Sequence, residues 1–175
     1  MSMRLMLLRH AKTERATPGG RDRDRKLTAR GRSDAPVIGA YMAHHDLTPD
    51  LALVSAAKRA QETWTFIAGA FGRSPRTQSD ERIYNATPQT LLAVIGAARK
   101  AQMLLVVGHN PGLHDLAVQL IASGDVDMRE QLKEKLPTSG LVVIDLPIGD
   151  WSLIHPHAGR LERFVSPRLI AAATE

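Results

Sequence analysis

The sequence predicts an α/β fold in which helices cover both faces of a mostly parallel central sheet, a three-layer α/β/α arrangement. Short apolar runs at 4–8, 51–54 and 103–107 are typical of buried strands. A segment with helical spacing follows each run, and this alternation implies parallel strands with right-handed crossovers. The chain has 175 residues, of which 43% are apolar. That is enough for the core of one domain, and we expect a single domain over 1–175.

The first predicted helix follows a polar loop. The loop, over 13–26, is rich in arginine, aspartate and glycine. Thr28 is a suitable N-cap for a helix that runs to about His45. Pro36 lies inside this helix and predicts a kink or a late start, because proline lacks a backbone N–H. Helical spacing also predicts one packed face, which comprises Val37, Ala40, Tyr41 and His44.

Two further helices are predicted before the strand at 103–107. Ser55 directly follows the second strand and can cap a helix with one apolar face. The residues of that face are Ala60, Trp64, Ile67, Ala68 and Phe71. A short strand is expected over 76–80. Thr87 and Pro88 then supply an N-cap and a first-turn proline for a helix that runs to about Ala98.

The run at 103–107 is the strongest strand signal in the chain. A helix is predicted to begin at Asn110 and Pro111, because the apolar residues after them recur at helical spacing on one face. The stretch 122–140 is polar and irregular, apart from a short helical piece near 129–136.

The C-terminal part predicts an antiparallel hairpin. Its strands are 141–146 and 151–154, joined by a turn that contains proline, glycine and aspartate. His155 and His157 flank a proline, and we interpret them as a surface turn rather than a metal site. A last short strand is expected at 164–165.

Composition excludes several classes of protein. Cysteine is absent, which rules out a disulfide framework, a thiolate metal site and a cysteine nucleophile. The first apolar run is too short for a signal peptide, and no stretch approaches the ~18 apolar residues of a membrane span. We therefore expect a cytoplasmic protein without a membrane partner. The net charge is +5, but the arginines are scattered, so phosphate explains the charge as well as nucleic acid does and no nucleic-acid partner is expected.

Polar side chains follow all three buried strands. Ligands of open α/β sheets bind beyond the carboxyl ends of the strands. At that edge the sequence places Arg9 and His10, the segment 55–59, and His109 with Asn110. Cations such as Lys58 and Arg59 are disfavoured in a first helical turn unless an anion binds there. The convergence predicts an anion site built from three remote parts of the chain.

The residue types at this edge suit phosphoryl transfer. Arginine matches phosphate oxygens with two parallel hydrogen bonds and stays charged. A neutral His10 can attack phosphorus and carry the phosphoryl group, which splits one displacement into two easier steps. A protonated His109 would stabilise charge on the equatorial oxygens. No carboxylate cluster suits magnesium and no GxxxxGK[ST] motif exists, so we expect fixed cations in place of a metal and no cofactor.

Four ordered motifs resemble the histidine phosphatase superfamily, whose fold is phosphoglycerate mutase-like. They are RHAK (9–12), LTARG (27–31), SAAKRAQET (55–63) and VGHNPG (107–112), and the likeness extends to FVSP (164–167). The greatest similarity is to the small SixA-type phosphohistidine phosphatases. The resemblance implies that His10 is the phosphorylated nucleophile and that Arg9, Arg59 and His109 form the phosphate pocket. Further candidate phosphate contacts are Asn110, Lys12 and Arg25.

The resemblance also bears on the proton donor and the substrate. Many relatives carry an acidic residue after the third strand, where Glu81 is the candidate general acid and Asp80 is adjacent. A departing imidazole, with a pKa near ~6.5, needs less protonation than an alkoxide. The segment 81–108 has room for one helix, and an open pocket suits a phosphorylated protein. The main expectation is therefore a phosphohistidine phosphatase acting on a protein. The alternatives are a phosphomonoesterase or mutase on a small phosphorylated metabolite, and a non-catalytic module that binds a phospho-ligand or nucleic acid.

Overall fold

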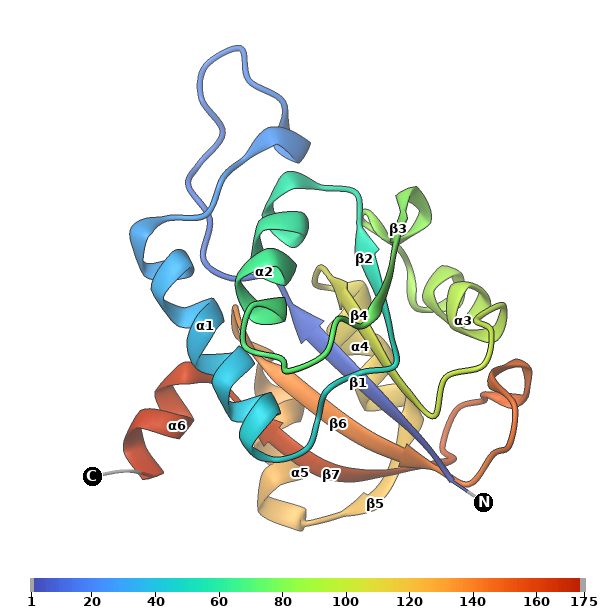
Figure 1. Cartoon of the computed structure of the whole chain (residues 1–175). Coiled ribbons are helices and arrows are strands. Elements are labelled where there is room, and N and C mark those ends of the chain that lie inside the picture. The colour runs from blue at the N-terminus through green and yellow to red at the C-terminus, as the bar shows by residue number, and fades with distance from the viewer. Residues whose placement is uncertain (1, 174–175) are drawn as a thin grey trace.

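The computed structural model describes residues 2–173, and its centre is a seven-stranded mixed sheet (Figure 1). The strand order is β3-β2-β4-β1-β6-β7-β5. The strands are β1 (Met3–Arg9), β2 (Leu51–Ser55), β3 (Arg76–Asp80), β4 (Met103–Gly108), β5 (Ile121–Gly124), β6 (Leu141–Leu146) and β7 (Gly159–Val165). The helices are α1 (Ala29–His44), α2 (Lys58–Ala68), α3 (Pro88–Gly96), α4 (Gly112–Leu120), α5 (Val126–Glu134) and α6 (Pro167–Ala173). The predicted three-layer α/β fold is confirmed.

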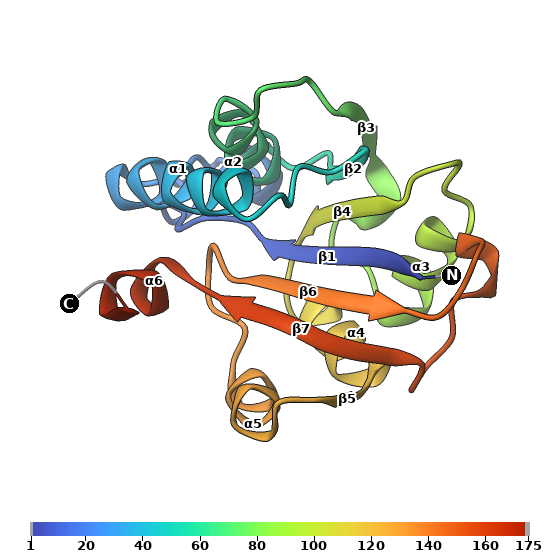
Figure 2. The ribbon, with the colours of Figure 1, turned by 60° about the horizontal axis from the view of Figure 1, so that its bottom comes forward.

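Burial explains why β1 lies in the middle of the sheet. It pairs with β4 in parallel and with β6 in antiparallel. Its side chains alternate between two cores, since Leu5 and Leu7 pack on one face and Met6 and Leu8 on the other. Helices α1 and α2 cover the second face, whereas α3, α4 and α5 cover the first, and Figure 2 shows α1 and α2 above the sheet with α4 and α5 below it. A strand buried on both faces reads as a continuous apolar run, as the sequence has it.

The parallel pairings bring three strand ends to one edge. β4 pairs in parallel with both β1 and β2, so these strands end side by side. The loop between β1 and α1 projects beyond this edge (Figure 1). Thr13 and Leu27 form an isolated antiparallel bridge at its base. The loop therefore rises from a paired neck over the predicted site.

Helix α1 is correctly predicted in extent but not in its buried face. Thr28 caps it, accepting a hydrogen bond from the Gly31 N–H at 3.0 Å, and it starts at Ala29 despite Pro36, so no late start occurs. The face that packs consists of Ala35, Ile38, Gly39 and Met42, while the predicted Val37 and His44 are exposed. The helix carries two apolar stripes one residue apart. A Cβ on Gly39 would lie 2.8 Å from the Ile67 carbonyl oxygen, so close approach to α2 selects the stripe with the small residues.

The predicted hairpin partner of β6 is wrong. Trp151–Leu153 is a 3₁₀ turn, because the Asp150 carboxylate accepts from the Ser152 N–H at 2.8 Å. The buried Trp151 indole also donates to the Ala101 carbonyl at 2.8 Å, which anchors it in the core. On the side of β6 away from β1, the antiparallel neighbour is β7, which includes the predicted strand at 164–165.

The region after α4 also differs from its prediction. β5 is a four-residue edge strand parallel to β7, too short to show a pattern in the sequence. Helix α5 begins at Val126 rather than near 129, because the Asp125 carboxylate accepts from the Met128 N–H at 2.9 Å. Between residues 2 and 173 no helix combines the length and the hydropathy needed to cross a membrane.

Candidate functional site

A cavity of about 750 Å³ opens at the edge where β1, β2 and β4 end. It contains all the sequence-predicted site residues except Glu81. Its lining consists of Arg9, His10, Lys12, Thr13, Arg15, Asp22, Arg25, Arg59, Asn85, His109, Asn110 and Thr138. Three remote segments therefore meet in one pocket, as the strand topology predicts.

His10 directly follows β1 and is only 8% exposed. Its Nδ1 lies 2.8 Å from the Ala11 carbonyl oxygen. Because that oxygen can only accept, Nδ1 carries the proton and Nε2 keeps a free lone pair. Burial is the main cause that lowers the pKa of His10 to about 4, and the positive charge of Arg59 lowers it further. The imidazole is therefore neutral near pH 7 and needs no base before it attacks an electrophile.

A hydrogen-bond chain couples the end of β1 to α2. The Ala11 N–H donates to the Thr63 hydroxyl at 2.9 Å, and that hydroxyl donates to the Arg59 carbonyl at 2.7 Å. Both side-chain and backbone partners are buried. These hydrogen bonds fix the position of His10 relative to Arg59, although the two residues lie on different elements.

His109 follows β4 and contacts Ser55 at the end of β2. The Ser55 Oγ lies 2.6 Å from His109 Nε2 and accepts from the Ala57 N–H at 3.2 Å. Because the Ser55 hydroxyl can donate to Nε2 while its oxygen accepts from the Ala57 N–H, we assign the ring proton of His109 to Nδ1. Nδ1 is buried and has no partner among the described residues. It is thus an unused N–H donor, 5.3 Å between ring centres from His10.

The protonated His109 expected from the sequence is not what this pocket favours. Burial, and then repulsion by a protonated His10 and by Arg59, lowers the pKa of His109 to about 3. The ring is neutral near pH 7 and offers a hydrogen bond rather than a full charge. The sequence shows neither the burial of His109 nor how close its ring lies to His10.

Arg9 and Asn110 are held by the same backbone carbonyl. Arg9 Nη1 donates to the Leu136 oxygen at 3.1 Å, and Asn110 Nδ2 donates to it at 2.9 Å. Arg9 Nε and Asn110 Oδ1 remain buried without a partner within the described residues. Buried polar atoms are nearly always paired, so these two atoms are available to a polar group that enters the pocket.

Arg59 lies in the first turn of α2 and is buried, as an anion site requires. Its guanidinium contacts Asp22 from the loop above. Nη1 donates to the Asp22 carbonyl at 2.9 Å and Nη2 to its carboxylate at 3.2 Å. The Tyr84 hydroxyl donates to the same carboxylate at 2.5 Å, and Arg25 Nη1 donates to it at 3.1 Å. Sequence reasoning missed Asp22 and Tyr84, since a lone acidic residue in a charged loop carries no signal of its own.

The remaining predicted residues divide into two groups. Lys12 is exposed at the cavity, with its backbone carbonyl held by the Thr28 N–H at 2.9 Å. Arg25 is engaged within the loop, where it also donates to the Thr13 hydroxyl at 2.8 Å. Glu81 lies outside the lining residues, and its carboxylate accepts two hydrogen bonds from Arg23 at 2.8 and 2.9 Å. The structure thus separates Glu81 from the other predicted residues.

Metal ligands are not grouped in the part of the chain that the structure describes, since no three His, Cys, Asp or Glu side chains are arranged to hold an ion. The pocket carries several cationic side chains. Five of them line it, namely Arg9, Lys12, Arg15, Arg25 and Arg59. The arrangement joins a neutral histidine with a free lone pair to fixed guanidinium groups, which suits attack on a phosphorus centre.

Comparison with known proteins agrees with this geometry. The family model of the histidine phosphatase superfamily (branch 1) matches residues 5–84. An uncharacterised protein of Mycobacterium tuberculosis (strain ATCC 25618 / H37Rv) is 34% identical over 165 residues, which is 92% of this chain and 100% of the relative.

Two solved structures extend the comparison. The "putative phosphohistidine phosphatase SixA" from Agrobacterium tumefaciens is 34% identical with a TM-score of 0.79, covering 94% of this chain and 98% of the other. The "Putative Phosphohistidine Phosphatase SixA" from Nakamurella multipartitia shares the fold at 23% identity, with a TM-score of 0.83 over 95% of this chain and 97% of the other. The chain therefore belongs to the histidine phosphatase superfamily, in its SixA-type branch, and is a hydrolase of the phosphatase class.

Proposed function

We propose that this phosphatase removes phosphate from phosphohistidine in a protein, through a phosphoryl group carried transiently on His10. The observation that carries the proposal is the state of His10. It is neutral, its Nδ1 donates to the Ala11 carbonyl, and its Nε2 lone pair is free beside two arginines. The name of the Agrobacterium tumefaciens relative supports the same substrate class.

The reaction would proceed in two displacements. First, the Nε2 lone pair of His10 attacks phosphorus while the bond from phosphorus to the substrate nitrogen breaks, and the leaving imidazole takes that electron pair. A substrate imidazole protonated on its other nitrogen leaves as a neutral ring. Water then attacks phosphorus, the bond to Nε2 breaks with its pair returning to His10, and the protons of the water pass to phosphate and solvent.

The proposed binding roles follow from the donors around His10. Arg9 and Arg59 would hold phosphate oxygens, because guanidinium groups match them with paired hydrogen bonds. The unpaired His109 Nδ1–H would donate to an equatorial oxygen, where charge gathers in the transition state. Asn110, Lys12 and Arg25 stay candidates for further contacts at the same cavity.

The state of the nearby carboxylates supports a nitrogen leaving group. Asp22 is an anion, because hydrogen bonds from Tyr84, and then from Arg25 and Arg59, lower its pKa to about 2. Glu81 is held in an ion pair by Arg23. Neither is poised to protonate an alkoxide, whereas an imidazole with a pKa near ~6.5 departs with less help. The general-acid role of Glu81 stays a prediction, and its carboxylate would first have to leave Arg23.

The test is a short incubation with a phosphohistidine protein, followed by quenching and mass spectrometry of the enzyme. We expect a phosphoryl group on wild type that survives base, is lost in acid, and is absent from His10→Ala. His44→Ala is the matched control, because His44 is exposed at the far end of α1. Full activity in His10→Ala would refute the proposal. Faster turnover of a sugar phosphate than of the phosphoprotein would instead favour the metabolite phosphatase.

A further inference from the structure

We propose that Asp22 is a specificity-determining residue, whose carboxylate competes with the substrate phosphate for Arg59 and disfavours substrates with a second anionic group near that phosphate. The inference rests on the proposed function in one respect, the assignment of Arg59 to the phosphate. Asp22 begins the 3₁₀ turn Asp22–Asp24 in the loop that rises over the pocket.

Asp22 accepts hydrogen bonds from the Arg59 guanidinium. Both terminal nitrogens of the guanidinium donate to this one residue, Nη1 to its carbonyl at 2.9 Å and Nη2 to its carboxylate at 3.2 Å. The Arg59 side chain is 5% exposed, so little of its hydrogen-bonding capacity faces water. A phosphate that binds the edge of the guanidinium formed by Nη1 and Nη2 must therefore displace Asp22 from it.

Asp22 also has other partners, which keep it at the pocket. Tyr84 donates to Oδ2 at 2.5 Å from the segment after β3, and Arg25 donates to Oδ1 at 3.1 Å from the loop itself. The Arg59 guanidinium also lies over the Tyr84 ring, 5.6 Å from its centre. When phosphate takes Arg59, these two donors still hold the carboxylate at the cavity that His10 lines.

The negative charge of Asp22 affects which substrates the pocket accepts. Asp22 is the one carboxylate among the described residues that line the cavity, and the donors around it keep it ionised. A carboxylate or second phosphate close to the reacting phosphate would meet a like charge there. A leaving imidazole, neutral or protonated, meets no repulsion. Asp22 therefore biases the pocket toward monophosphates on uncharged or cationic groups.

Inorganic phosphate tests the competition directly. We would measure its inhibition of the hydrolysis of p-nitrophenyl phosphate, an activated ester that needs no general acid. We expect the Ki for phosphate to fall about tenfold in Asp22→Asn and in Asp22→Ala, since charge at about 4 Å matters on this scale. Asp24→Asn is the matched control, because Asp24 lies in the same turn and pairs with the exposed Arg21. An unchanged Ki in both Asp22 variants, with melting temperatures equal to wild type, would overturn the proposal.

A matched pair of ligands tests whether Asp22 discriminates against a second anionic group. Phosphoglycolate and ethyl phosphate differ in a carboxylate close to the phosphate, and both can be assayed as competitive inhibitors. We expect Asp22→Asn to tighten phosphoglycolate about tenfold more than ethyl phosphate. Equal changes for the two ligands would show that Asp22 does not select by charge.

A third variant separates this inference from the proposed function. Arg59→Lys should weaken inhibition by inorganic phosphate, because a lysine cannot replace the paired donors. If Arg59→Lys left that inhibition unchanged, the assignment of the phosphate site would fail. If it weakened inhibition while the Asp22 variants matched wild type, the Asp22 inference alone would fail.

Discussion

His10 and His109 lie 5.3 Å apart between ring centres, in a pocket where burial is the largest influence on both pKa values. The pocket thus stores two neutral imidazoles near pH 7. One has a free lone pair and the other an unused N–H, according to the hydrogen bonds each ring makes. Placement within the fold, rather than residue type, divides the roles of nucleophile and donor.

This burial predicts an acid-sensitive stability. Histidine in the unfolded chain has a pKa of about 6.5, whereas in the fold the values are about 4 for His10 and about 3 for His109. Between these values the unfolded state binds protons and the folded state does not, so the free energy of unfolding falls as pH drops below about 6.5. Urea unfolding at several pH values should show a shallower fall in His109→Asn than in wild type. His44→Asn, at an exposed site, should match wild type, and parallel curves for all three proteins would contradict the prediction.

Ser55 is predicted to act through His109. Ser55→Ala removes the hydroxyl 2.6 Å from Nε2, so the ring loses the partner that sets its tautomer and orientation. We expect kcat/KM to fall about tenfold, the effect of one buried hydrogen bond of about 1.4 kcal/mol. Steady-state kinetics on p-nitrophenyl phosphate would measure it. Ser74→Ala, at an exposed position just before β3, should leave kcat/KM unchanged.

At the scale of elements, the site depends on how closely helix starts approach neighbouring segments. The first residue of α4, Gly112, follows the His109 loop. A Cβ built on it would lie 1.9 Å from the Ala86 carbonyl oxygen, just before α3. Only glycine lets α4 begin there, so the position of His109 depends on a backbone contact between two segments distant in the sequence.

Gly112→Ala should therefore lower both stability and activity. The added methyl group must push the start of α4 away from Ala86, and overpacking of this kind costs about 1–3 kcal/mol. Chemical denaturation would measure the loss of stability, and kcat/KM would report displacement of His109. Gly72→Ala is the control, because nothing lies within 4 Å of a Cβ there. Equal stability of the two variants would refute the prediction.

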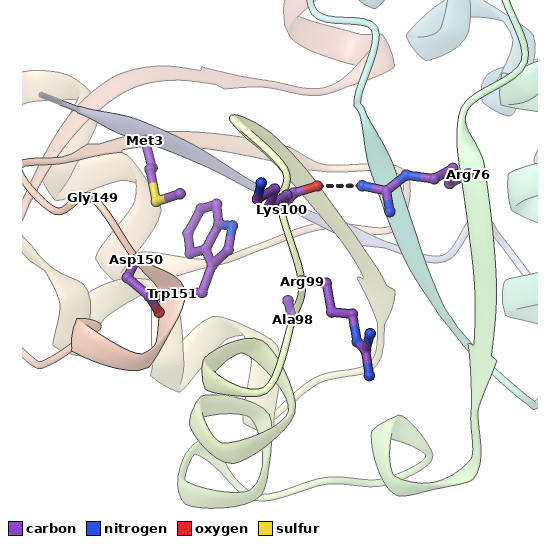
Figure 3. A pocket seen from close by; sticks show the side chains of 8 residues that line it. All are labelled: Met3, Arg76, Ala98, Arg99, Lys100, Gly149, Asp150 and Trp151. Atoms are coloured by element: carbon purple, nitrogen blue, oxygen red, sulfur yellow. Dashed lines mark hydrogen bonds between the residues drawn. The ribbon is translucent and has the colours of Figure 1, made fainter.

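At the scale of the whole molecule, positive charge gathers at both ends of the sheet. At the pocket, Lys12 and Arg15 make no ion pair or hydrogen bond through their head groups within residues 2–173. At the opposite end, Figure 3 shows Arg99 and Lys100 beside a second hollow, where Arg76 donates to the Lys100 carbonyl. Two positive charges can therefore be removed by substitution either at the pocket or at the end of the sheet far from it.

The dependence of kcat/KM on ionic strength should therefore differ between variants that lose charge at the pocket and variants that lose it at the opposite end. Cations at the pocket mouth raise the local concentration of an anionic substrate, and at physiological ionic strength salt screens this attraction beyond about 8–10 Å. We expect kcat/KM to fall with added salt in wild type, and to fall less steeply in the double variant Lys12→Gln, Arg15→Gln. The double variant Arg99→Gln, Lys100→Gln removes the same charge and should keep the wild-type slope. Identical slopes in all three proteins would contradict this reading.

What the sequence determined by itself is the parallel part of the sheet and the edge at which the functional side chains meet. Apolar runs and helical spacing are local, so they identify β1, β2, β4 and the helices after them, and parallel topology then brings Arg9, Arg59 and His109 together. The short β5 and the 3₁₀ turn at Trp151 leave too few residues for a pattern, which is why their region was predicted wrongly.

Only the tertiary structure decided the state of the site. The tautomers and pKa values of both histidines depend on burial, and the packed face of α1 depends on the approach of Gly39 to Ile67. The contacts of Asp22 with Arg59 and Tyr84 join residues 37 and 62 positions apart. Contacts of this range leave no periodicity in the sequence, because they depend on where the loop between β1 and α1 lies once the sheet is assembled.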